Sequence, residues 1–98
     1  MKEKIMILNA MKYVKEGKTK GRLGFIILKP SDSDNYRGYS DVACYYDVND
    51  DFINIFPKEI FLEPVFATFE EKPGFGTSLN TRKILKSIEY KGNVINLL

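Results

Sequence analysis

The feature that most constrains the fold of this chain is a series of short runs rich in Val, Ile, Phe, Tyr and Thr, separated by Gly, Pro, Asn and Asp. Residues of the first group favour β-strands, and residues of the second favour turns. The spacing of the runs is typical of a small barrel or sandwich rather than of alternating helices and strands. Because 98 residues are enough for one domain and short for two, the sequence predicts a single all-β domain over residues 1–98.

The turn-forming residues divide the chain into the elements that we expect. Strands are expected over residues 5–14, 22–28, 39–47, 64–71 and 81–90. Loops or turns are expected over residues 15–21, 31–38, 48–51, 72–76 and 91–93.

Two further features concern segments outside these strands. Residues 57–59 are expected to begin a single helical turn, with Ile60, Phe61 and Leu62 packed beneath it. The apolar residues 94–98 are expected to be docked against the domain rather than loose.

The composition argues against most enzymatic chemistry. There is no histidine, the side chain most used for proton transfer near neutral pH and for zinc binding. The single cysteine, Cys44, has no disulfide partner and no histidine to activate it, so we expect an inert, half-buried thiol. Neither a Walker-type loop nor a GxGxxG motif is present. We therefore expect no enzyme, no cofactor and no metal.

No run of the sequence is apolar for long enough to span a membrane, and the first residues are broken by polar side chains where a signal peptide is apolar. We therefore expect a cytoplasmic protein that does not enter a membrane.

The net charge of +2 conceals an uneven distribution along the chain. Residues 1–29 carry eight Lys or Arg and two acids, residues 30–71 carry two and ten, and residues 72–98 carry five and one. The segment sums of +6, −8 and +4 indicate a basic surface from the two ends and an acidic one from the middle. The alternative is that these charge blocks are only solvated faces.

Two devices that act together in single-strand binding are both present in the sequence. Cations track the phosphates, and flat rings stack on unpaired bases. Residues 12–22 place four lysines and Arg22 beside Tyr13, on a loop whose glycines allow close approach of a nucleic-acid backbone. In the strand 39–47, alternation directs Tyr39 and Tyr45 away from the core.

Three stretches follow one another along the chain: Glu16-Gly17-Lys18, Cys44-Tyr45-Tyr46-Asp47-Val48, and residues 72–79 followed by Arg82 and Ile84. In this order they resemble the gene V type helix-destabilising proteins of filamentous phages. The resemblance implies a small OB-like, five-stranded barrel with a protruding hairpin wing, coating single-stranded DNA as a homodimer. The acidic middle, with an insertion at residues 31–35, and the tail from Gly92 depart from the family pattern.

Carried over residue by residue, the resemblance implies that Tyr45 faces DNA after the buried Cys44, that Phe75 lies at the tip of the wing, and that Arg82 returns from it. The basic loop of the family falls on Lys15, Lys18, Lys20 and Arg22. Together with the strand pattern, the expected nucleic-acid-binding set is Lys15, Lys18, Lys20, Arg22, Tyr39, Tyr45, Phe75, Arg82, Lys83 and Lys86.

Two functions follow as alternatives. The first is sequence-independent binding of single-stranded DNA, or of RNA, in replication of a phage or mobile element in a bacterial host. The second is inhibition of a host DNA-binding protein by mimicry of DNA, through an acidic set that comprises Asp32, Asp34, Asp41, Asp47, Asp50, Asp51 and Glu63.

Overall fold

The computed structural model describes residues 2–73 and 81–97, the side chains of residues 72, 73, 81 and 82 excepted. Strands make up most of this part of the chain, so the prediction of an all-β fold is confirmed. The main sheet has the order β5-β2-β1-β6-β7-β8, and each pair of neighbours is antiparallel. Its strands are β1 (Lys2–Lys15), β2 (Lys18–Ile27), β5 (Asp41–Asp47), β6 (Pro64–Pro73), β7 (Thr81–Tyr90) and β8 (Asn93–Asn96).

The main sheet thus has six strands in the described residues, one more than the five expected. The additional strand is β8, which is the apolar end that we expected to be docked. It pairs with β7 after a two-residue turn in which Lys91 and Gly92 have φ values of 48° and 80°. Such a turn matches the twist of the strands that it joins, so the end of the chain folds directly back onto the sheet.

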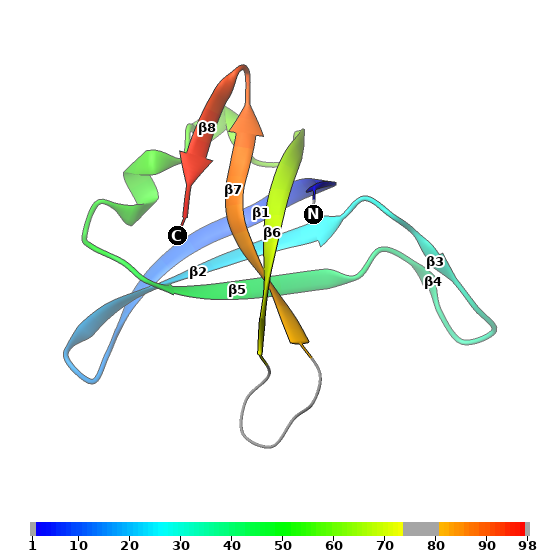
Figure 1. The fold of residues 1–98 in the computed structure, drawn as a ribbon, viewed down its shortest axis with the longest axis horizontal. Coiled ribbons are helices and arrows are strands. Elements are labelled where there is room, and N and C mark those ends of the chain that lie inside the picture. Colours follow the sequence, from blue (N-terminus) through cyan, green and yellow to red (C-terminus); the bar gives the residue numbers. More distant parts are fainter. Residues whose placement is uncertain (1, 74–80, 98) are drawn as a thin grey trace.

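The β1–β2 connection is shorter than the loop expected over residues 15–21. Glu16 and Gly17 form a two-residue turn with φ values of 53° and 76°, and Lys15 pairs with Lys18. Continuing the ladder to the turn gives the backbone groups of residues 18–21 hydrogen-bond partners, which an open loop does not. The hairpin therefore projects as a twisted two-stranded ribbon, at the lower left of Figure 1.

The segment expected as a polar loop contains a second small sheet. Strands β3 (Ser31–Asp32) and β4 (Arg37–Gly38) pair, and Arg37 Nε lies 3.1 Å from Asp32 Oδ1. This hairpin extends away from the main sheet at the right of Figure 1.

Two short 3₁₀ helices connect β5 to β6. They are η1 (Phe52–Ile55) and η2 (Lys58–Ile60), and the second is the helical turn expected near Pro57. Ile60 is fully buried and Phe61 partly buried beneath it, but Leu62 is 65 % exposed, so its predicted burial is wrong. Leu62 has a φ of 65° in the turn before β6, and its side chain faces solvent there.

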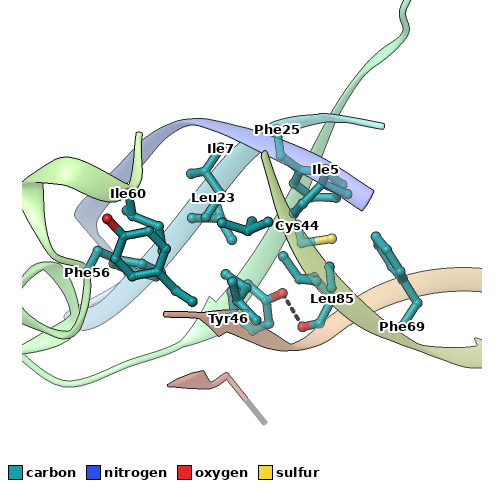
Figure 2. Packing of buried hydrophobic residues seen from close by; sticks show 14 of the residues in the cluster. Ile5, Ile7, Leu23, Phe25, Cys44, Tyr46, Phe56, Ile60, Phe69 and Leu85 are labelled. Carbon is teal, nitrogen blue, oxygen red and sulfur yellow. Dashed lines mark hydrogen bonds between the residues drawn. The ribbon is translucent and has the colours of Figure 1, made fainter. Parts of the chain in front are cut away.

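One apolar core lies inside the curl of the main sheet (Figure 2). Ile5 and Leu23 are fully buried within it, and Cys44 is buried more completely than expected. The hydroxyl of Tyr46 donates a hydrogen bond of 2.5 Å to the backbone oxygen of Leu85, and burial raises the pKa of this tyrosine. This contact places β7 against the inward side of β5, across the core.

The sheet is therefore curled around its core. In the described residues no ladder closes it, and β5 and β8 remain its two edges. Within the same residues, no helix is long and apolar enough to cross a lipid bilayer.

Candidate nucleic-acid interface

The register of three strands gathers a basic and aromatic surface on one face of the sheet. Across β1, β2 and β5, Met11 is opposite Arg22 and Arg22 is opposite Tyr45. Directly opposite residues of paired strands point to the same side, so these three side chains form one row. We call this surface the hairpin face; it comprises Asn9, Met11, Tyr13, Lys15, Lys18, Lys20, Arg22, Tyr45 and Asp47.

Tyr45 is the most exposed tyrosine ring in the described part of the chain. Its exposed fraction is 60 %, whereas the flanking Cys44 and Tyr46 are 5 % and 6 % exposed. The two neighbours are directed inward by their contacts with the backbone oxygens of Lys83 and Leu85 on β7. Period-two alternation then leaves Tyr45 on the outside, as the sequence predicted.

Arg22 lies in the middle of the row and contacts a neighbouring side chain on β1. Its Nη1 donates a hydrogen bond of 3.2 Å to Oδ1 of Asn9. A Cβ atom at Gly24 would lie 2.9 Å from that oxygen and 3.2 Å from Nη1, so glycine leaves the space in which the two side chains meet. Sequence reasoning missed Asn9 and Gly24, because this contact depends on the pairing of β1 with β2.

A second row lies nearer the hairpin end and contains an ion pair. Tyr13 is opposite Lys20, and Lys20 is opposite Asp47, whose carboxylate binds the Lys20 ammonium. The side-chain hydrogen bond with Asp47 raises the pKa of Lys20, and the same bond lowers the pKa of Asp47. Lys20 is therefore already neutralised in part, so it is a weaker phosphate contact than the sequence suggested.

The hairpin end adds two exposed cations, Lys15 and Lys18, which are directly opposite each other. Lys12 belongs to the same stretch of sequence but points to the other side of the ribbon. Its Nζ donates a hydrogen bond of 2.9 Å to the backbone oxygen of Asp50, next to η1. Lys12 therefore attaches the hairpin to the segment before η1 and does not contribute to the hairpin face.

Tyr39 does not lie on a strand, contrary to the expected strand over residues 39–47. β5 begins at Asp41, and Tyr39 lies in the connection from the β3–β4 hairpin, where the Tyr36 hydroxyl donates a 2.7 Å hydrogen bond to its backbone oxygen. That local bond takes the place of a ladder partner for Tyr39. Its ring is exposed, but no cross-strand row includes it.

The basic residues of β7 share no ladder with the hairpin face. Lys83 and Lys86 are exposed, and β7 pairs with β6 and β8 rather than with β1, β2 or β5. No cross-strand row among the described residues joins these lysines to Tyr45, so the expected convergence of cations from both ends of the chain stays a prediction for them. Phe75 and the side chain of Arg82 lie outside the described residues.

Two acidic residues of the middle segment are paired with cations. Asp32 binds Arg37, and Asp47 binds Lys20. Their charges are partly neutralised, which lessens what these two residues contribute to an acidic surface of the kind that a DNA mimic presents.

Comparison of the chain with protein-family models, with curated proteins and with solved structures found no match.

Proposed function

We propose that this protein binds single-stranded DNA through the hairpin face, without enzymatic activity and with little sequence preference. The observation that carries the proposal is the row in which Arg22 lies between Met11 and Tyr45, with Lys15 and Lys18 farther along the same ribbon. Exposed rings beside cations are the combination that unpaired bases and their phosphates require.

The rings and cations of the hairpin face can both contribute to the free energy of binding a single strand. Stacking of one base contributes about 1–3 kcal/mol, and Tyr45 and the partly buried Tyr13 offer two rings. A duplex offers no unstacked bases to these rings, so the face favours single strands. Lys15, Lys18 and Arg22 form no salt bridge with the described residues, so their charges are available to phosphates.

The resemblance to the gene V type proteins extends the proposal to its biological setting. By that resemblance, the protein acts as a homodimer that coats DNA during replication of a phage or mobile element, in the cytoplasm of a bacterial host. The same chemistry accepts RNA where a ribose hydroxyl is tolerated.

A titration with single-stranded and duplex oligonucleotides of equal length tests the proposal. Because the chain contains no tryptophan, binding is followed by quenching of tyrosine emission. We expect quenching by oligothymidylate alone, and an affinity that falls with salt at a log–log slope of about −0.7 for each phosphate neutralised. Equal binding of the duplex, or an affinity independent of salt, would contradict the proposal.

A further inference from the structure

A second exposed ring lies on the outward side of the same sheet, at the other end of β1. Across β1, β6, β7 and β8, the outward row consists of Lys4, Phe66, Glu89 and Val94. Phe66 is 49 % exposed, although its neighbours Val65 and Ala67 are buried in the core. The ring therefore faces solvent because of strand alternation, and the core does not depend on it.

Two ammonium groups lie close to this ring. Lys2 Nζ is 5.6 Å and Lys4 Nζ is 6.0 Å from the ring centroid, which is within the range of cation–π attraction. We call Lys2, Lys4 and Phe66 the Phe66 platform. Glu89 takes up part of the charge, since its carboxylate lies 2.9 Å from Lys2 Nζ. Within the described residues, Lys4 forms no salt bridge.

A hollow beside the ring leaves room for a flat group. Its volume is about 370 Å³, and it is lined by Phe66, Glu89, Lys91, Gly92 and Val94. Lys91 lies at the edge of the hollow, 5.2 Å from the centroid of the Tyr90 ring, and its charge is offset by Glu63 and Glu59 nearby. The site thus combines an exposed aromatic face with two lysines, of which Lys4 forms no salt bridge with the described residues.

The Phe66 platform is continuous with the hairpin face through β1. Lys4, Met6 and Met11 point outward from this one strand, and a bulge between Ile7 and Asn9 lies between the two groups. Seven residues separate Lys4 from Met11, a path of about 23 Å at the rise of an extended strand. An oligonucleotide of ordinary binding-site length covers that distance.

We propose that the Phe66 platform is a second stacking position for the same nucleic-acid strand, with a base on Phe66 and adjacent phosphates on Lys2 and Lys4. The inference rests on the proposed function and adds to it a binding path along the outward side of β1. It predicts that full affinity requires an oligonucleotide long enough to reach both rings.

The test compares Phe66→Ala, Phe66→Leu and Tyr45→Ala with the unaltered protein, using oligothymidylates of about three and about twelve nucleotides. We expect Phe66→Ala to weaken binding of the longer oligonucleotide by about five- to a hundredfold, the equivalent of one stacked base. Phe66→Leu should lose most of this factor too, because leucine keeps the apolar contact but provides no ring. Leu62→Ala is the matched control, since it removes an exposed apolar group that belongs neither to this row nor to the hollow.

Each other outcome overturns the inference in a recognisable way. If Tyr45→Ala weakens binding and Phe66→Ala does not, the second position is excluded while the proposed function stands. If leucine restores full affinity, the ring acts as an apolar contact and not as a stacking platform. If Phe66→Ala dissociates a dimer in sedimentation without changing the affinity of each chain, the patch is a contact between copies. If the unaltered protein binds neither oligonucleotide, the proposed function and the inference fail together.

Discussion

The hairpin face and the Phe66 platform use the same types of side chain with different balances of charge. On the hairpin face, Lys15, Lys18 and Arg22 form no salt bridge with described residues, and only Lys20 is bound by a carboxylate. On the platform, one of the two lysines that approach the ring is bound by Glu89. An exposed ring can stack on a base on either surface. The electrostatic part of the affinity, which comes from contacts with phosphates, depends on how many cations are unpaired. The hairpin face should therefore supply most of the salt-dependent affinity.

Removing the free charges of the hairpin face should have the largest effect. The triple variant Lys15→Gln, Lys18→Gln and Arg22→Gln should weaken binding of oligothymidylate about a hundredfold near 0.1 M salt and flatten the log–log salt slope by about 2. Lys12→Gln is the matched control, because Lys12 belongs to the same ribbon but bonds to Asp50 on the other side. Equal losses of affinity in the two variants would show that the side of the ribbon on which a cation lies does not matter, which would contradict the special role of the hairpin face.

Removing the central ring should have the next largest effect. Tyr45→Ala should cost about 1–3 kcal/mol of binding free energy in the oligonucleotide titration, and the salt slope should stay unchanged because no charge is lost. Thermal unfolding should be little affected, since the ring is mostly outside the core. Tyr36→Ala removes an exposed tyrosine of the β3–β4 hairpin and should leave affinity unaltered. If Tyr45→Ala changed the slope of log affinity against log salt concentration and not the affinity at a given salt concentration, Tyr45 would act on the phosphate contacts and not by stacking.

Releasing the bound lysine should strengthen binding. Asp47→Asn removes a negative charge and frees Lys20, so the salt slope should steepen by up to about 0.7, one further phosphate contact. Folding stability provides the second readout. Because Lys20 lowers the pKa of Asp47 in the folded chain, the pair stabilises the protein above the ordinary carboxyl pKa of about 4. That contribution is lost as pH falls through the lowered value.

The pH dependence can be measured by following urea unfolding of the two chains from neutral pH downward. The Asp47→Asn chain should lack the decline in stability that this pair causes below about pH 4. Identical profiles for the two chains would show that the ion pair does not form in solution.

The smallest effect is expected at the contact that holds Arg22. In Gly24→Ala, the new Cβ displaces the Asn9 amide and the Arg22 guanidinium, whose ends are flexible. We expect a loss of about 0.5–1 kcal/mol of binding free energy, comparable to one hydrogen bond, with the fold intact. Asn9→Ala should reproduce this loss, and a Gly24→Ala effect without an Asn9→Ala effect would point to the backbone instead.

Much of the fold and part of the site followed from local patterns. Alternation around Cys44 predicted the outward direction of Tyr45, and the bounds of β7 match the expected strand over residues 81–90. Turn residues located the β1–β2 and β7–β8 connections, although the first is shorter than expected. These features depend on a few adjacent residues, which is why one sequence reveals them.

Local sequence patterns do not predict which side of the sheet each residue of β1 faces. Ile5 and Ile7 point inward, and simple alternation would direct Met11 inward and Lys12 outward. The bulge between Ile7 and Asn9 reverses this parity, so that Met11 joins the hairpin face and Lys12 bonds to Asp50. A bulge inserts one unpaired residue into a ladder, and the residue types around Leu8 do not predict it.

The sequence by itself determined the all-β class, the positions of the turns and the side of β5 on which Tyr45 lies, because strand period and turn chemistry are local properties. Only the tertiary structure decided which cations share that side, since register pairs residues far apart in the chain. Lys20 meets Asp47 across 27 residues, and Lys2 meets Glu89 across 87. The charge available to a ligand therefore follows from strand pairing, and composition alone does not show it.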